Sequence, residues 1–320
     1  MERKYHSEGA LIVETGKTLF FPVEYLGKID SNIVKDCHLY AILAIDEFYF
    51  VPEKTIQSEE GVSFSFVTRT EGKERIFNLP VLPLIKNYDH RQLRIDHIYP
   101  NNVIKIVKRK KDDPAQEEEI MMTAQEILLT YASVILDKIE FEVMYIGQAY
   151  GKTGNRSAYD RLENHETLQR ILREALLNHP NKHIYILLMQ MNYSNMILFD
   201  GANRNVLKSY KESEKHLRRM VKNPAKESQV INISEAAMIR YFKPKCNNIF
   251  VDNFPNIKTT SYKQFYDLDY NEIIIGINLQ QEGFPQVQLY TENSRIDSPD
   301  DLIRFSLATE QDRKSIFEIF

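Results

Sequence analysis

The chain has 320 residues, of which 27% are charged and 43% are hydrophobic, as in a folded globular protein about two domains long. Its 11 Gly and 12 Pro exclude a collagen-like or low-complexity chain, and its 17 Phe and 18 Tyr exclude disorder as the main state. The longest apolar run, Leu128–Leu136, is about half of the roughly 20 residues that a membrane helix needs. We therefore expect no membrane partner.

Two further features predict a cytoplasmic location. The first residues, Met1–Lys4, are followed by mixed polar sequence without the apolar stretch of a secretory signal. The two cysteines, Cys37 and Cys246, cannot form a disulfide framework, and they suit a reducing compartment.

Charge is distributed unevenly along the chain. The net charge of −4 argues against a uniformly basic nucleic-acid binder. It divides into −3 for residues 1–120, +5 for residues 121–250 and −6 for residues 251–320. A basic middle between acidic flanks fits a surface that faces phosphate, and it equally fits ordinary surface variation.

Residues 1–106 contain short segments rich in β-branched and aromatic residues, several of which alternate between apolar and polar, as in Val62–Phe66. They predict a β-rich domain over residues 1–110, built as a small barrel or sandwich. The expected strands are Ala10–Val13, Thr18–Leu26, His38–Leu43, Glu47–Val51, Val62–Thr68 and Glu74–Asn78. The charged segment Lys105–Glu119 that follows predicts a solvated linker or the edge of one.

From residue 120 the pattern becomes α/β. Ile127–Leu136 fits either a strand or a buried helix. We expect strands at Glu140–Gln148 and His183–Met189, and helices at Ser157–Leu177, Val206–Lys222 and Ser234–Phe242. In the last part of the chain we expect a hairpin of Glu272–Leu279 and Gln286–Thr291 and a helix over Ser306–Phe320.

The predicted fold class is therefore α+β. A β-rich domain of unknown role (1–110) would precede a small mixed α/β domain (120–255) and a β-containing C-terminal extension (256–320).

Two polar residues interrupt the apolar stripe of the predicted helix Ser157–Leu177. On a helical wheel, Arg161 and His165 fall within the stripe and lie one turn apart. An arginine that faces a core must be paired or must line a cleft. The alternatives are an arginine that extends past the helix end to solvent and a hydrogen-bonded core histidine.

A carboxylate also lies on an apolar stripe in the predicted helix Ser234–Phe242. Glu235 would be in the first turn, where a negative charge favours the helix dipole, and Ser234 would be the N-cap. Its alignment with the stripe makes it equally a candidate for a carboxylate that faces a cleft.

These residue types suit phosphodiester chemistry. An arginine donates paired hydrogen bonds to phosphate oxygens. One carboxylate can hold a Mg²⁺ that keeps most of its waters, and a histidine or tyrosine can move a proton at the attacking water.

Four elements in order resemble the GIY-YIG nuclease superfamily. They are Tyr145-Ile146-Gly147 at a strand end, Arg161-x-x-x-His165 on the next helix, Glu235 on a later helix, and Pro244-Lys245-Cys246-Asn247 after it. The stretches YIGQAYGKTGNRSAYDRLENHETLQ and SEAAMIRYFKPKCNNIF are similar to a subgroup of uncharacterised bacterial proteins. The resemblance covers residues about 125–255.

The resemblance implies a small mixed sheet with helices that cuts DNA with one divalent metal. Glu235 would hold Mg²⁺ or Mn²⁺, Arg161 would contact the phosphate, and Tyr145 would lie close to the attacking water. His165 matches a histidine that some members carry near the site. Gly147 and Asn247 would support the site.

The chain departs from the family pattern in two places. The first motif, Gly-Ile-Tyr on the preceding strand, is absent as such, and Tyr131 is the nearest stand-in for its tyrosine. Cys246 replaces the tyrosine that usually precedes the last asparagine.

Basic residues near this region would bind nucleic acid. The helix Val206–Lys222 carries Lys215, Arg218 and Arg219, and we add Lys152 and Arg156. The alternative for the helix is a solvated face with i,i+4 pairs.

The sequence thus predicts a metal-dependent endonuclease that acts on DNA, or on RNA, in host or antiviral defence or restriction. A second hypothesis is an inactive module of the same fold that binds nucleic acid or protein. The N-terminal domain would choose the target, hold a protein partner or form a homo-oligomer.

Overall fold

The structure is a computed structural model, and it describes residues 3–70, 73–86, 88–109, 116–150, 158–162, 166–178, 180–199, 206–280 and 285–308. It contains both helices and sheets, so the α+β class is confirmed. No helix in these ranges is both long and apolar enough to cross a membrane.

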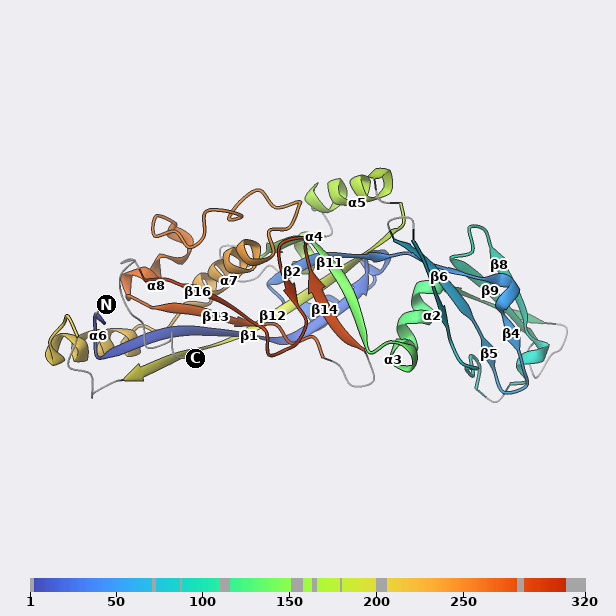
Figure 1. The fold of residues 1–320 in the computed structure, drawn as a ribbon, viewed down its shortest axis with the longest axis horizontal. Helices are drawn as coiled ribbons and strands as arrows, with labels where there is room; N and C mark the ends of the chain where they lie inside the picture. Colours follow the sequence, from blue (N-terminus) through green and yellow to red (C-terminus); the bar gives the residue numbers. More distant parts are fainter. Residues whose placement is uncertain are drawn as a thin grey trace.

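A central sheet of eight strands has the order β15-β14-β11-β2-β12-β1-β13-β16 (Figure 1). Its strands are β1 (Ser7–Pro22), β2 (Leu39–Asp46), β11 (Lys138–Gln148), β12 (Lys182–Phe199), β13 (Glu272–Gly276), β14 (Gln286–Tyr290), β15 (Arg295–Ile296) and β16 (Leu302–Ser306). β2 runs antiparallel to β11 on one side and to β12 on the other. Its sequence LYAILAID is almost wholly apolar because neighbouring strands and both packed faces bury it.

Alternate residues of the central strands enter two cores. Leu39, Ala41 and Leu43 join one core, whereas Ile42 and Ala44 join the other. The first core is covered by α6 (Tyr210–Lys222), α7 (Glu227–Phe242) and α8 (Lys263–Asp267), with the 3-10 helix η4 (Thr260–Tyr262). The second is covered by α1 (Ser31–Val34), α4 (Ala158–Leu162) and α5 (Glu166–Asn178), after the 3-10 helix η1 (Val23–Tyr25).

Residues 47–137 form a β-rich insertion between β2 and β11, at the opposite end of the molecule from α6 (Figure 1). It contains the sheets β3-β6-β7, β8-β9-β10 and β4-β5. Its elements are β3 (Phe48–Phe50), η2 (Pro52–Lys54), β4 (Ile56–Gln57), β5 (Val62–Ser63), β6 (Ser65–Thr70), β7 (Lys73–Asn78), η3 (His90–Gln92), β8 (Arg94–Ile98), β9 (Val103–Arg109), β10 (Glu117–Thr123), α2 (Ala124–Thr130) and α3 (Ala132–Ile135). The phenylalanines of β3 and β6 and the apolar face of α2 continue the first core.

The strands do not divide at residue 110. β1 and β2 lie in the same sheet as β11 and β12, and β13 to β16 complete that sheet from the expected C-terminal extension. The helix and strand pattern of residues 120–255 therefore describes only part of one continuous sheet.

The prediction of a solvated linker at Lys105–Glu119 is wrong. β9 and β10 pair antiparallel from Arg109–Glu117 to Val103–Thr123. Opposite charges face each other across this pair, with Nζ–Oε distances of 2.7 Å for Lys105–Glu119 and 3.2 Å for Lys108–Glu118. The described charged residues on both sides of this segment therefore belong to a strand pair, and residues 110–115 lie outside the described residues.

The predicted hairpin of Glu272–Leu279 and Gln286–Thr291 is also wrong. β13 pairs with β1 and β16, whereas β14 pairs with β11 and β15, and four strands lie between β13 and β14 in the sheet. Both strands are apolar and short, so each can pair with any free edge of a large sheet. Their closeness in sequence therefore did not make them pair with each other.

Four predicted segments differ from the observed elements, and for the first of them the sequence left strand and helix open. Ile127–Leu136 corresponds to the helices α2 and α3, and Ser157–Leu177 to the two helices α4 and α5. α7 begins at Glu227, so Ser234 is not its N-cap and Glu235 is not in its first turn. The expected helix Ser306–Phe320 begins where β16 ends, and residues 309–320 lie outside the described residues.

Candidate active site

The candidate site is built on the antiparallel pair of β2 and β11. In their register Tyr40 lies opposite Gly147, and Tyr145 lies opposite Ile42. The rings of Tyr40 and Tyr145 are 6.0 Å apart between centroids, with 36° between their planes. The pair brings together two tyrosines that are 105 residues apart in the chain.

Gly147 makes room for these two rings. A Cβ atom built at Gly147 would lie 2.5 Å from Tyr40 Oη and 2.8 Å from Tyr145 Cε1, which is closer than carbon contacts allow. The glycine of the Tyr-Ile-Gly motif is therefore required by packing.

Both phenols are held as neutral hydroxyl groups at neutral pH. Burial raises the pKa of Tyr40 and of Tyr145, and the carboxylate of Glu235 raises both further. The two hydroxyls are joined by a hydrogen bond. Such a pair can orient a water molecule through its remaining lone pairs.

Glu235 reaches this pair from α7, which packs against β11. Burial raises its pKa from 4.5 to about 7, although the Arg161 cation and the N–H of Gln148 both act to lower it. The carboxylate is thus poorly hydrated and close to half protonated at pH 7.

Arg161 lies in the last turn of α4, on the other face of the sheet. Its guanidinium donates a hydrogen bond to the carbonyl of Gln148 and lowers the pKa of Tyr145 and Glu235 through its charge. The peptide groups of Gln148 therefore position both partners: the carbonyl accepts from Arg161 and the N–H donates to Glu235.

Asn247 closes the open edge of β11. β14 pairs with β11 only as far as Glu142. Beyond that point, Asn247 Oδ1 accepts from the N–H of Ile146 at 2.9 Å, and its Nδ2 donates to the Ile146 carbonyl at 2.8 Å. The N–H of Cys246 donates to the Met144 carbonyl at 3.1 Å. Side chain and backbone together replace a neighbouring strand.

A second group of residues lies where β2 and β11 meet the helices, and the sequence did not single it out. His38 precedes Tyr40 by two residues, and its ring contacts Tyr150 edge-on at 5.0 Å between centroids. Tyr150 Oη donates to Glu227 at 2.9 Å, in the first turn of α7. His38 Nδ1 is buried and has no hydrogen-bond partner among the described residues.

Tyr131 does not join the site. It caps the C-terminus of α2, where its N–H donates to the Ile127 carbonyl at 3.1 Å, and its side chain packs on the first core. Tyr40 instead occupies the strand beside Tyr145. The signal was present as His38-Leu39-Tyr40 on a predicted strand, but its distance along the chain concealed it.

The predicted nucleic-acid contacts are separated from this site. Lys215, Arg218 and Arg219 are exposed on α6, at the far end of the sheet (Figure 1). Arg218 pairs with Glu214 at 2.7 Å, and Arg219 donates to the Asp267 carbonyl at 2.8 Å. His165, Lys152 and Arg156 lie outside the described residues.

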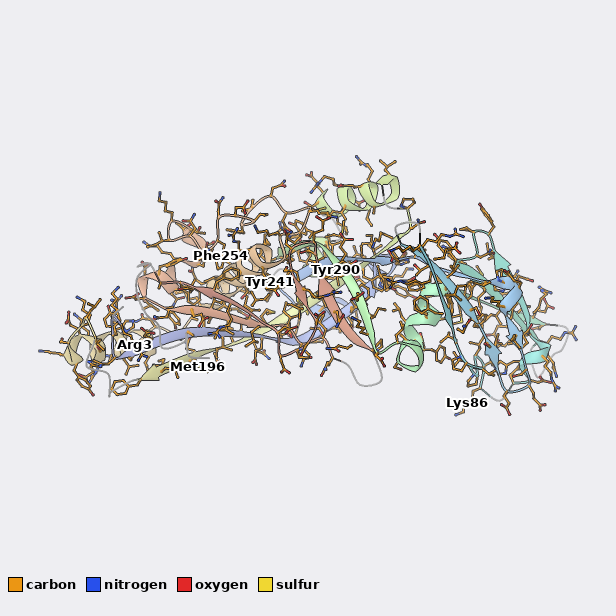
Figure 2. The ribbon with its side chains drawn as sticks, in the orientation of Figure 1. Arg3, Lys86, Met196, Tyr241, Phe254 and Tyr290 are labelled. Atoms are coloured by element: carbon orange, nitrogen blue, oxygen red, sulfur yellow. The ribbon has the colours of Figure 1, made fainter. Side chains whose placement is uncertain are left out.

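A cavity of about 470 Å³ lies elsewhere, beside the last residues of β2 and the middle of β11. Tyr290, labelled in Figure 2, lines it together with Glu142 and Lys182. Its charges satisfy one another: Lys182 pairs with Asp46 at 2.8 Å, and Lys245 with Glu142 at 3.2 Å. It has no residue in common with the tyrosine pair, Arg161 or Glu235.

The described residues contain no cluster of three or more His, Cys, Asp or Glu side chains that could bind a metal. Glu235 is instead a single carboxylate beside two tyrosine hydroxyls. A buried carboxylate with a raised pKa is stabilised by a nearby cation, and Mg²⁺ commonly binds through one or two carboxylates while keeping its waters. The donor set therefore fits one hydrated divalent cation.

Comparison with known proteins returns no match: no family model, no curated protein and no solved structure is similar to this chain. What the protein does must therefore be argued from the site itself.

Proposed function

We propose that this chain is a divalent-metal-dependent endonuclease of the GIY-YIG type that hydrolyses phosphodiester bonds of DNA. One observation carries the proposal. Tyr40, Tyr145, Arg161 and Glu235 come from four different elements, and each affects the titration of another through charge or a hydrogen bond. A cation, a carboxylate and two hydroxyls near one another are the groups that phosphodiester hydrolysis uses.

Tyr40 takes the part of the first motif tyrosine in this proposal. It lies on the strand next to Tyr145, and the register of β2 and β11 places it against Gly147. The insertion of residues 47–137 then separates the two motif strands along the chain while leaving them adjacent in the sheet. His38 stands where the motif has glycine.

Arg161 would bind the scissile phosphate. Its guanidinium carries five N–H donors, and the Gln148 carbonyl accepts from it, so donors remain for phosphate oxygens. Held in that orientation, the cation stabilises the extra negative charge that develops as water attacks phosphorus. The neutral hydroxyls of Tyr40 and Tyr145 would orient that water and pass its proton onward.

Glu235 would hold the metal. When bound, a Mg²⁺ or Mn²⁺ ion would polarise the phosphate and lower the pKa of its own waters. Because the cation competes with a proton for the Glu235 carboxylate, whose metal-free pKa is about 7, its affinity should rise with pH up to about pH 8.

Cleavage assays test the proposal. Plasmid, linear duplex, single-stranded DNA and RNA would be incubated with the protein in Mg²⁺, Mn²⁺ or EDTA. We expect metal-dependent cleavage that Glu235→Ala and Arg161→Ala abolish. Cleavage that survives Glu235→Ala would place the active site elsewhere.

Two matched variants separate the candidate tyrosines. Tyr40→Phe should lower the cleavage rate at least tenfold, whereas Tyr131→Phe, on the exposed side of the insertion core, should leave it unchanged. A loss of cleavage in Tyr131→Phe but not in Tyr40→Phe would mean that Tyr131 is the first motif tyrosine.

A second candidate is a module of the same fold that binds nucleic acid without cutting it. The histidine at the motif glycine and Cys246 at the usual tyrosine favour this reading. Under it, no metal condition gives cleavage, and Glu235→Ala leaves a gel shift with the same nucleic acids intact. A cytoplasmic location and a role in defence or restriction remain predictions from the sequence.

A further inference from the structure

β12 is the longest strand of the central sheet, and its two halves have different surroundings. Over Lys182–Met189 it lies between β2 and β1. Over residues 190–199 it pairs with β1 alone, and no described strand pairs with its other edge. Figure 1 shows this half at the lower margin of the sheet, with no ribbon beyond it. We call residues 190–199 the free edge.

The free edge carries no charged residue, and the sequence from Ile184 to Phe199 contains none. Several of its apolar side chains are exposed: Tyr193 by 40%, Met196 by 40% and Phe199 by 56%. Figure 2 shows Met196 on this margin of the sheet. Unpaired backbone groups beside exposed apolar side chains favour pairing with another strand.

The terminal strands of the described sheets are protected against pairing. β16, the edge strand that follows β13, carries Arg304, paired with Glu272 at 2.9 Å. β7, β8 and β10 carry lysine, arginine or acidic residues, and the remaining edge strands, β3, β4, β5 and β15, have three residues or fewer. Charge and short length are the usual means by which proteins prevent edge pairing, and the free edge has neither.

We propose that the free edges of two copies of this chain pair antiparallel, which joins two central sheets into one. Antiparallel pairing of identical strands about a two-fold axis places the same residues on both sides of the interface. Because the strand is uncharged, no like charges meet there, whereas a charged strand would repel its own copy. Ten residues offer about ten outward backbone groups for interchain hydrogen bonds.

The pairing would bring two candidate sites together. β2 begins at Leu39, opposite Met189, so the free edge starts beside the end of β2 that carries Tyr40 and follows His38. This consequence rests on the proposed nuclease function, and the dimer itself does not. Two sites on one sheet would let one assembly cut both strands of a duplex.

The mass in solution tests the proposal in the absence of nucleic acid and metal, so its result is independent of cleavage. Light scattering after gel filtration should give twice 37.6 kDa for the wild type. The double variant Ser194→Lys/Met196→Lys should dissociate the dimer, with Kd raised at least about tenfold by repulsion of like charges across the axis. Met121→Lys, at an exposed methionine on β10, is the matched control and should leave the dimer intact.

A charge-swap experiment shows that the contact is between two copies of this edge. Ser194→Glu/Met196→Glu should also be monomeric, and mixing it with the lysine variant should restore a dimer. A dimer that the lysine variant retains, or a mixture that stays monomeric, would overturn the proposal.

Hydrogen exchange of the wild type gives a test without any substitution. Amides of residues 190–199 should exchange more slowly as protein concentration is raised about a hundredfold, whereas those of β13 should not change. A monomer with no concentration dependence would contradict the pairing.

Discussion

Replacing Glu235 by glutamine should stabilise the metal-free protein at high pH. The fold raises the pKa of this carboxyl from 4.5 to about 7, so the native state binds a proton that the unfolded state has released between these two values. Stability therefore falls as pH rises through that window and is lowest above it. A neutral glutamine of the same shape does not carry this penalty.

The size of the effect follows from the shift. A change from 4.5 to about 7 corresponds to roughly 3 kcal/mol once the carboxyl is fully ionised, above about pH 8. At pH 5, most of the native carboxyl is protonated, so the wild type and the variant should differ by less than about 1 kcal/mol. The stability difference between the two proteins should therefore change by about 2–3 kcal/mol between pH 5 and pH 8.

Urea unfolding in EDTA at several pH values measures this difference. The control is Glu227→Gln, which replaces an exposed carboxylate in the first turn of the same helix and should change stability by about 0.5 kcal/mol or less at every pH. A Glu235→Gln variant that is less stable than the wild type at pH 8, or a difference that does not vary with pH, would refute the reasoning about burial.

The same unfolding assay tests two substitutions beside the site and one at the opposite end of β2, with Gly276→Ala as a control. Gly147→Ala should lower the free energy of unfolding by about 1–3 kcal/mol because its Cβ collides with two tyrosine rings. In the control Gly276→Ala the Cβ approaches nothing closer than 3.5 Å, so the loss should be less than about 1 kcal/mol. Equal losses would mean that the tyrosine rings move aside freely. Asn247→Ala removes both hydrogen bonds to the edge of β11 and should cost about 1–3 kcal/mol, and a smaller loss would show that water replaces them. His183 forms ion pairs with Glu24 and Glu47, which raise its pKa to about 9. His183→Gln should therefore lower the free energy of unfolding by a few kcal/mol below pH 6.5 and by progressively less as pH rises to 9. A loss that stays constant across that range would contradict the ion pairs.

Much of the local structure and part of the site followed from the sequence. The resemblance grouped Tyr145, Gly147, Arg161, Glu235 and Asn247, and the structure brings these residues near one another although Tyr145 and Glu235 are 90 residues apart in the chain. The elements that carry them have clear periodicity. The strand ending in Tyr-Ile-Gly was predicted within two residues of its observed start. The first residues of α7 were not predicted as helical. This helix is buried on most of its sides, so its apolar residues do not form the single stripe that identifies a helix in sequence.

The predictions that failed were those that depended on which strands pair in the sheet. Tyr40 was on a predicted strand, but nothing in the residues between β2 and β11 shows that these strands pair. The hairpin prediction for β13 and β14 failed for the same reason: periodicity identifies a strand, whereas its partner is chosen by competition among all free edges. The linker prediction treated charge as a sign of solvation, although cross-strand ion pairs stabilise β9 and β10.

The insertion between β2 and β11 also sets the order in which the site can appear during synthesis. Tyr40 leaves the ribosome long before Tyr145, and Glu235 follows later still, so at about 5–20 residues per second the nascent chain carries the first tyrosine for roughly 10–40 s before the carboxylate exists. Until β11 and β12 have been made, β2 lacks both of its neighbours in the sheet, and its apolar strand must be kept from other chains. The candidate site is therefore absent from every incomplete translation product that stops before α7, which means that a growing polypeptide cannot carry this site until most of its sheet has been made.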